Sequence, residues 1–313
     1  MDNASRRIVI TGAGSPLGQG LMEELREQTE VEWIRGIEAK PARDPASNSD
    51  LDIVPFSSDH RAFQEYLAEH SPDTVIQCGL SPDRTGRAST GGEADVIGTM
   101  RLGAAIGSAG VSVRNWVISS STAVYPISSS APLIAGEDAP VHTELDPFIA
   151  SIVEAEDYAR DLAVRAPHIN VSILRLQQLV GSGVEGALAR LLRADSIPSP
   201  IGFDASIQLL HLEDAAQALA FAARVELAGL YNVASTGLIH WNTAIARRGQ
   251  RGTPTLPIGS GPFEGVLGRL GVPFIPSGLR DLLRYGHAVD IQKIERAGWK
   301  PKYDQRSCLA HLG

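Results

Sequence analysis

The chain has 313 residues, a formal net charge of −8 and a pI of about 5.5. An acidic balance argues against nucleic acid or an anionic membrane as the main partner. Two cysteines, Cys78 and Cys308, exclude a disulfide framework and predict a reducing compartment. Residues 1–7 lack the apolar core of a secretory signal, no apolar run is long enough to span a membrane, and no metal-ligand spacing occurs. We therefore expect a cytoplasmic protein without a metal.

The first predicted element is a buried strand that ends in a glycine-rich turn, followed by a helix over residues 17–26. The free N–H groups and the dipole at such a helix N-terminus favour a phosphate. The glycines permit the tight turn and the close packing of helix on sheet. The residues expected to surround a dinucleotide here are Gly12, Gly14, Ser15, Pro16, Leu17 and Gly18.

An acidic residue follows at the spacing that a dinucleotide site requires. Glu38 lies twenty positions after Gly18, at the end of the apolar run 33–37. A carboxylate there accepts both ribose hydroxyls of an adenosine and repels a 2′-phosphate. The pattern predicts NAD binding rather than NADP binding. The alternative is a surface turn with an unrelated acid after it.

Strands and helices alternate up to about residue 180, which predicts a Rossmann-type, doubly wound parallel α/β sheet. The predicted strands include residues 73–80 and 115–119, and the predicted helices include residues 94–109 and 148–165. Ligands bind off the carboxyl ends of such strands. Cys78, Gly79, Leu80 and Ser119 are therefore expected to border the cofactor, together with the loop over residues 81–92.

Several motifs together resemble one family. Thr11, Gly12 and Gly18 match the loop TGxxGxxG, with Ser15 at the middle glycine. The other matching segments are residues 95–99 (DVIGT), 120–125 (SSTAVY), 175–181 (RLQQLVG), 211–216 (HLEDAA), 231–233 (YNV) and 298–301 (GWKP). On these residues the chain resembles the extended short-chain dehydrogenases/reductases, the NAD-dependent epimerase/dehydratase family that includes UDP-galactose 4-epimerase.

The chain departs from this family at the catalytic helix. The resemblance implies a Tyr-xxx-Lys pair there, in which tyrosine is the acid/base and lysine holds the nicotinamide ribose. Phe148 and Ile152 occupy these positions, and neither side chain has a proton to transfer or a charge. The chain has no lysine between residues 41 and 292, so no shifted alignment restores the pair. The simplest interpretation of Phe148 and Ile152 is that they are core residues.

Other residues near this helix are candidates for the missing chemistry. Ser121 keeps the family's catalytic serine position, where it orients the substrate oxygen. Tyr125, His142 and Asp146 are candidates for a substitute acid/base. Each has an ordinary alternative: Tyr125 as a packing residue, His142 as loop surface, and Asp146 as part of a helix start.

The resemblance also implies a smaller C-terminal α/β substrate lobe, residues 181–313, interleaved with the NAD-binding part, residues 1–180. Gln178 stands where many members have a substrate-contacting asparagine, often for a nucleotide-sugar. Arg190, Arg193 and Arg284 are candidates for a diphosphate, or lie on a solvated face.

Helices over residues 94–109 and 148–165 correspond to those of the family's homodimer, so we expect a homodimer. Two functions remain open. The protein is an epimerase/dehydratase-like enzyme with a rebuilt active site, acting on a nucleotide-sugar or a similar small molecule, or a catalytically inactive NAD-binding sensor or partner subunit. A scaffold that no longer binds NAD is a third hypothesis, with Ser15 as its support.

Overall fold

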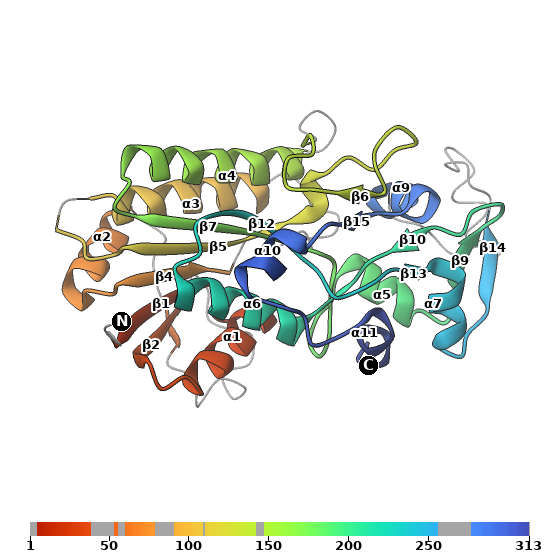
Figure 1. Cartoon of the computed structure of the whole chain (residues 1–313), viewed down its shortest axis with the longest axis horizontal. Helices are drawn as coiled ribbons and strands as arrows, with labels where there is room; N and C mark the ends of the chain where they lie inside the picture. Colours follow the sequence, from red (N-terminus) through yellow and green to blue (C-terminus); the bar gives the residue numbers. More distant parts are fainter. Residues whose placement is uncertain are drawn as a thin grey trace.

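The computed structural model describes residues 5–38, 53–55, 60–78, 91–108, 110–141, 147–255 and 277–312. A parallel sheet of seven strands forms its centre (Figure 1). In spatial order the strands are β12 (Gly229–Val233), β7 (Asn170–Leu176), β5 (Asn115–Ser121), β4 (Thr74–Gln77), β1 (Arg6–Thr11), β2 (Val31–Glu38) and β3 (Ile53–Pro55). The order reverses at β1, between β2 and β4, as in a Rossmann-type sheet. The predicted fold class is confirmed.

The strands of this sheet are apolar because both of its faces are covered. Ile8, Val9 and Ile10 in β1 are fully buried, and so are Val75 and Ile76 in β4. Near-continuous apolar runs are typical of parallel strands that helices cover on both sides. Periodicity therefore located these strands from the sequence alone.

Helices form one layer on each face of the sheet (Figure 1). On one face, α1 (Pro16–Arg26) packs against α6 (Leu212–Val225). On the other face lie α2 (His60–His70), α3 (Gly91–Ile106) and α4 (Pro147–Arg165). The helix predicted over residues 94–109 begins three residues earlier and ends at Ile106. Such shifts at helix ends are ordinary, because terminal turns are held by few contacts.

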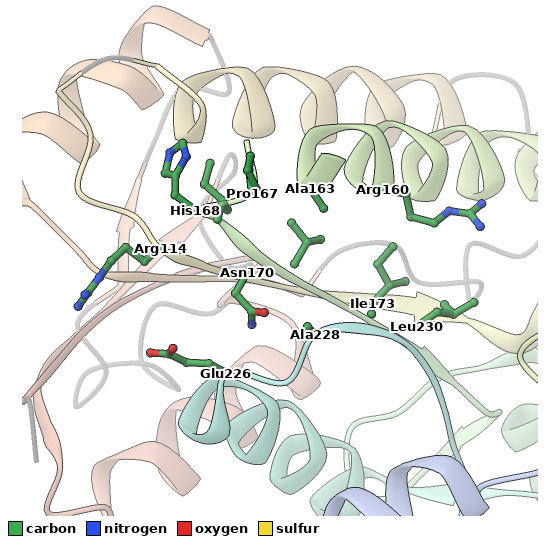
Figure 2. Close-up of a pocket in the computed structure, with 13 residues that line it drawn as sticks. Arg114, Arg160, Ala163, Pro167, His168, Asn170, Ile173, Glu226, Ala228 and Leu230 are labelled. Carbon is green, nitrogen blue, oxygen red and sulfur yellow. The ribbon is translucent and has the colours of Figure 1, made fainter. Parts of the chain in front are cut away.

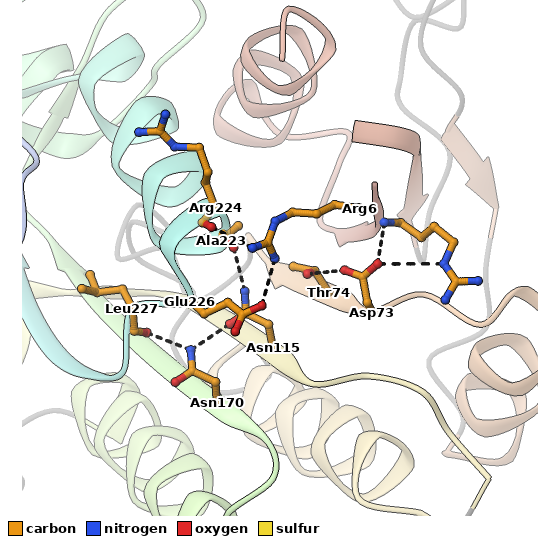
Figure 3. Close-up of polar contacts among 10 residues, drawn as sticks. Arg6, Asp73, Thr74, Asn115, Asn170, Ala223, Arg224, Glu226 and Leu227 are labelled. Carbon is orange, nitrogen blue, oxygen red and sulfur yellow. Dashed lines mark hydrogen bonds and ion pairs between the residues drawn. The ribbon is translucent and has the colours of Figure 1, made fainter. Parts of the chain in front are cut away.

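A polar network joins the end of α6 and the residues before β12 to the amino end of the sheet (Figure 3). The Asn115 amide donates to the carbonyl oxygen of Ala223 at 3.0 Å, and the Asn170 amide donates to Asn115 Oδ1 at 3.0 Å and to the Leu227 oxygen at 3.2 Å. These bonds satisfy the buried polar groups where α6 turns into β12. Residues beyond 180 thereby complete the sheet layer.

The remaining C-terminal residues build a lobe of short elements around Trp241, which is fully buried. Its helices are α5 (Ala187–Arg193), α7 (Trp241–Arg247), α9 (Ser277–Tyr285) and α11 (Gln305–Ala310). Its two-stranded ladders pair β8 (Leu179–Val180) with β11 (Leu210–His211), β9 (Ile197–Pro200) with β14 (Gly252–Thr255), β10 (Ser206–Ile207) with β13 (Ile239–His240), and β6 (Ile134–Ala135) with β15 (Ala288–Val289).

Two local features of this lobe depend on its pairing and capping. Residues 206–211 form two short strands, because the chain pairs first with β13 and then with β8. Ile291 is at the cap position of α10 (Gln292–Ala297), and Asp290 Oδ1 accepts the Gln292 N–H at 2.8 Å. Among the described residues, no helix is both long and apolar enough to cross a membrane.

Candidate dinucleotide and substrate site

The turn between β1 and α1 requires glycine at two positions. Gly12 has φ +71°, and a Cβ there would lie 1.8 Å from the Cys78 carbonyl oxygen. A Cβ on Gly18 would lie 2.4 Å from the Gly12 oxygen and 2.6 Å from Ala13 Cα. Both glycines thus allow backbone segments to approach more closely than any other residue permits. The approach brings the start of α1 against the carboxyl ends of β1 and β4.

Ser15 begins α1 as its N-cap residue. Its φ is −76°, so a serine here is unstrained. Its hydroxyl donates to the Gly12 oxygen at 2.8 Å and accepts the Gly18 N–H at 3.0 Å. Because Pro16 has no N–H, Leu17 carries the next first-turn donor. The helix dipole adds positive potential at this point. The turn therefore keeps an anion-favouring end, with fewer free donors than a turn without proline.

Glu38, the last residue of β2, reaches the glycine turn. Its Oε2 accepts the Gly14 N–H at 3.1 Å. A Cβ on Gly14 would lie 3.2 Å from the same oxygen, so glycine also gives the carboxylate room. The structure thus brings together the acid and the turn, which are separated by about twenty residues in the chain. A carboxylate beside a phosphate-binding turn is placed to accept ribose hydroxyls.

Cys78 and Ser119 lie at the carboxyl ends of neighbouring strands. The Cys78 N–H donates to the Thr11 oxygen at 2.9 Å, and burial raises the pKa of its thiol to about 12. Cys78 is therefore a neutral packing residue and not a nucleophile. Ser119 is buried in β5. The predicted cofactor residues Gly79 and Leu80 lie outside the described residues, as does most of the loop over residues 81–92.

Ser121 and Tyr125 flank one short turn after β5. Ser121 Oγ accepts the Ala123 N–H at 3.1 Å and so caps the 3₁₀ turn η2 (Thr122–Val124). The Tyr125 hydroxyl donates to Asn232 Oδ1 at 2.8 Å, and burial raises the pKa of Tyr125. In this conformation the phenol is a packing and hydrogen-bonding group. The other two candidates for the acid/base, His142 and Asp146, lie outside the described residues.

Phe148 and Ile152 lie one turn apart at the start of α4. Ile152 is 1% exposed and belongs to an apolar cluster with Val124 and Val289, against which Phe148 packs. Phe148 and Ile152 therefore face apolar neighbours. Their apolar environment matches their chemistry, because an ammonium group among these apolar neighbours would lose its hydration.

A buried ion pair lies one turn further along α4. Glu156 accepts hydrogen bonds from Arg175 of β7, at 3.0 Å and 3.2 Å from Nε and at 2.5 Å from Nη2. Ser120 Oγ donates to the same carboxylate, and the guanidinium lies 4.9 Å from the centre of the Tyr125 ring. Burial alone would lower the pKa of Arg175, but its hydrogen bonds with Glu156 and the charge of Glu156 raise it. The guanidinium therefore stays charged.

A second buried polar group joins the sheet to the C-terminal lobe. Gln177 Oε1 accepts Thr122 Oγ1 at 2.8 Å and the Gln178 N–H at 3.0 Å. Gln177 Nε2 lies 3.3 Å from Nδ1 of His287, whose side chain is buried. Burial lowers the pKa of His287 to about 4, so the imidazole is neutral at pH 7.

The predicted substrate residues lie in different environments. Gln178 is half-buried, and its carbonyl oxygen accepts the Leu210 N–H at 2.9 Å. Arg190 and Arg284 are exposed, and the Arg284 guanidinium lies 5.2 Å from the centre of the Phe203 ring. Arg193 instead donates to three backbone carbonyl groups and ties α5 to the end of the chain. In this structure its guanidinium therefore has a structural role.

The comparison with known families gives a match that covers most of this architecture. The profile of the NAD dependent epimerase/dehydratase family matches residues 8–234. The chain belongs to this family. Membership confirms the family inferred from the motifs, and the family's dependence on NAD confirms the predicted cofactor. The glycine turn and Glu38 fit such a group, since backbone clearance, a helix N-terminus and a carboxylate meet at one point.

Similar proteins extend along the whole chain. Rv0501 of Mycobacterium tuberculosis is 28% identical over 302 residues, which cover 95% of this chain and 80% of that protein. The structure of MoeE5 in complex with UDP-glucose and NAD has a TM-score of 0.72 and 20% identity, covering 98% of this chain and 97% of that one. The UDP-Glc/GlcNAc 4-epimerase of Campylobacter jejuni has a TM-score of 0.74 at 14% identity, covering 98% of each chain. The two structures share the epimerase fold with this chain.

A separate pocket of about 460 Å³ lies at the opposite end of the sheet from the glycine turn (Figure 2). Arg114, His168 and Leu230 line it, near the amino ends of β5, β7 and β12. Ligands of open α/β sheets bind off the carboxyl ends. The position of this pocket therefore separates it from the cofactor site.

Sequence analysis missed two groups in this family member, the Glu156–Arg175 pair and His287. Glu156 follows Ile152 by one helical turn, and Arg175 opens the segment RLQQLVG. This spacing was visible in the sequence. His287 had no local signal, because its side chain contacts Gln177, which lies 110 positions earlier.

Proposed function

We propose that this chain is an NAD-binding protein of the epimerase/dehydratase type that acts on a nucleotide-sugar through a non-standard active site. The observation that carries the proposal is the contact between the Gly14 N–H and Glu38 Oε2. It places a carboxylate at a turn that only glycine can form, and together they make a ribose and phosphate site.

Different groups of the protein contact different parts of the cofactor in this proposal. The Leu17 N–H and the start of α1 face the pyrophosphate. Glu38 exchanges its hydrogen bond from the Gly14 N–H for hydrogen bonds from the ribose hydroxyls. Gly12, Ser15, Pro16 and Gly18 shape the turn around them. When bound, NAD supplies a hydride acceptor, and Cys78 and Ser119 border it. A 2′-phosphate would meet the charge of Glu38, which favours NAD over NADP.

The proposed active site retains the serine of the family and lacks its tyrosine and lysine. Ser121 orients a substrate oxygen. Tyr125 is the candidate for proton transfer, and it must exchange its bond to Asn232 for one to the substrate. Phe148 and Ile152 take no part in proton transfer, because they have no ionisable group.

The proposed substrate is a nucleotide-sugar. The complex of MoeE5 with UDP-glucose and NAD supports this class of ligand for the shared fold. In this chain the proposed contacts are Gln178 for the sugar and Arg190 and Arg284 for the diphosphate, since guanidinium groups pair well with phosphate oxygens.

We further propose a homodimer in the cytoplasm. The outer layer of α3 and α4 exposes apolar residues, including Val164, which is 82% exposed, and Ile97, which is 38% exposed. Apolar side chains on an outer helix layer favour a protein partner. Cys78 and Cys308 are free thiols, as expected in a reducing compartment.

A catalytically inactive NAD sensor or partner subunit is a second candidate, and the apolar surroundings of Ile152 favour it. Both candidates bind NAD, so turnover separates them. Conversion of UDP-glucose by the NAD-loaded protein, followed by NMR of the sugar, supports the enzyme. Unchanged UDP-glucose, UDP-glucuronic acid and UDP-N-acetylglucosamine alongside tight NAD binding support the sensor.

Calorimetric titration with NAD⁺, NADH and NADP⁺ tests the shared proposal, after any cofactor carried through purification is removed. Glu38→Gln is expected to weaken NAD⁺ binding roughly tenfold or more, because hydrogen bonds to a charged acceptor are lost. It should also narrow the preference for NAD⁺ over NADP⁺. Glu32→Gln, on the exposed side of the same strand, is the matched control and should change neither value. Wild-type protein that binds no dinucleotide would refute the proposal.

A further inference from the structure

His287 lies where the C-terminal lobe meets the carboxyl ends of the sheet strands. It immediately precedes β15, which pairs with β6, and its N–H donates to the Ser206 oxygen at 3.0 Å. Figure 1 shows β6 and β15 beyond the arrowheads of β5 and β7. Its side chain is 5% exposed. The imidazole is therefore enclosed at the end of the sheet where Ser121 and Gln178 also lie.

The neighbouring amide determines which nitrogen of His287 carries the proton. The backbone N–H of Gln178 can only donate, so the Gln177 atom that it contacts at 3.0 Å is the oxygen. Thr122 Oγ1 donates to the same oxygen at 2.8 Å. The NH₂ group of Gln177 consequently faces Nδ1 of His287 at 3.3 Å, and an NH₂ group only donates. Nδ1 is the acceptor, and the neutral ring carries its proton on Nε2.

The Nε2–H donor is buried and has no hydrogen-bond partner among the described residues. Buried donors are nearly always paired, so an unpaired one needs an explanation. The side chain is 5% exposed, so bulk solvent does not reach this donor. A ligand atom that arrives with the substrate would complete the hydrogen bonding.

Short covalent and hydrogen-bonded links connect this donor to the proposed active site. Thr122 directly follows Ser121, and Gln177 directly precedes Gln178. The His287 ring centre lies 6.1 Å from that of Tyr125. The hydrogen bond from Gln177 thus fixes the position of the His287 ring relative to the residues that are proposed to surround the substrate.

We propose that His287 Nε2–H donates a hydrogen bond to a hydroxyl or carbonyl oxygen of the bound substrate and that Gln177 holds the ring in this tautomer. This inference rests on the proposed function and deepens it by naming a specificity-determining residue. A neutral imidazole supplies no countercharge, so its partner is an uncharged oxygen of the sugar or base. In this proposal the exposed arginines, and not His287, bind the phosphates.

Two-bond ¹H–¹⁵N spectra of protein with labelled histidine test the tautomer without any turnover. We expect His287 to carry its proton on Nε2 at pH 7, and the Nε2–H resonance to move downfield when UDP-glucose is added to NAD⁺-loaded protein. A proton on Nδ1 would overturn the inference.

Calorimetry on the NAD⁺-loaded protein tests the contact, with UDP-glucose, UDP-glucuronic acid and UDP-N-acetylglucosamine as probes. His287→Leu should weaken the binding of the tightest-binding probe about tenfold, which is the contribution of one buried neutral hydrogen bond to affinity. His287→Gln places a donor near the position of Nε2 and should restore part of the affinity. His240→Leu removes an exposed histidine of the same lobe and should change nothing.

The outcomes separate the inference from the proposed function. If wild-type protein binds neither NAD⁺ nor any of the three nucleotide-sugars, the proposed function is wrong and the inference falls with it. If wild type binds a probe and His287→Leu binds it equally well, the inference alone is wrong. The spectra provide a result on wild-type protein even if the leucine variant does not fold.

Discussion

Replacing Glu156 with glutamine perturbs the charge of the buried pair while leaving its shape almost unchanged. The side chains of Arg175 and Glu156 are 2% and 0% exposed, and they share three hydrogen bonds. Glutamine leaves a buried guanidinium without its counter-charge and presents an NH₂ group where an acceptor oxygen was. Removing one partner of a buried pair costs about 3–5 kcal/mol. We expect Glu156→Gln to lower the free energy of unfolding by this amount.

Urea denaturation at pH 7, followed by circular dichroism, measures this change. Glu65→Gln is the matched control, because the Arg61–Glu65 pair is 84% and 67% exposed and should contribute less than about 0.5 kcal/mol. The double variant Glu156→Leu with Arg175→Met removes both charges and should recover much of the loss. A loss below about 1 kcal/mol for Glu156→Gln would refute the argument that desolvation sets the strength of this pair.

Three further predictions concern the turn, the histidine and the altered helix. Gly12→Ala should abolish NAD⁺ binding in calorimetry, because its Cβ would overlap a carbonyl oxygen, whereas Gly20→Ala, whose Cβ has room, should bind normally. Burial lowers the pKa of His287 in the folded protein to about 4. As the pH falls, His287 of the unfolded chain therefore binds its proton at a higher pH than His287 of the folded chain does. Stability should therefore be full above about pH 6.5 and fall by about 3 kcal/mol toward pH 4, and urea titrations should show a smaller fall for His287→Gln. Adding Ile152→Lys to Phe148→Tyr buries an ammonium group, and should lower the stability of the Phe148→Tyr variant by about 2 kcal/mol or more in thermal unfolding. An unchanged melting temperature would show that the apolar cluster opens to solvent.

Local sequence was sufficient for the sheet and for the cofactor turn. The strands were found because burial on both faces makes their central residues apolar, as at residues 8–10 of β1 and 75–76 of β4. Gly12 and Gly18 were recognised because a turn of this tightness excludes other side chains, and Glu38 because it follows at the required spacing. Each of these signals lies within a few dozen residues of chain.

The polar interior of the site was not predictable in the same way. Tyr125 was a candidate for proton transfer, yet its hydroxyl meets Asn232, more than a hundred residues later. Arg193 was a candidate for a diphosphate, yet it binds the carbonyl oxygen of Leu312. Such pairs depend on how β12 and the C-terminal lobe pack against the rest of the sheet. Hydrophobic periodicity in the sequence does not predict that packing.

Periodicity and glycine spacing decided the fold class, the family and the cofactor, because these properties depend on contacts between neighbouring segments. The tertiary structure alone decided that Tyr125 bonds to Asn232 and that His287, among the described residues, has an unpaired donor beside Gln177. The physical reason is the range of the interactions. Burial and hydrogen-bond satisfaction belong to a three-dimensional neighbourhood, and here that neighbourhood brings together residues separated by more than a hundred positions.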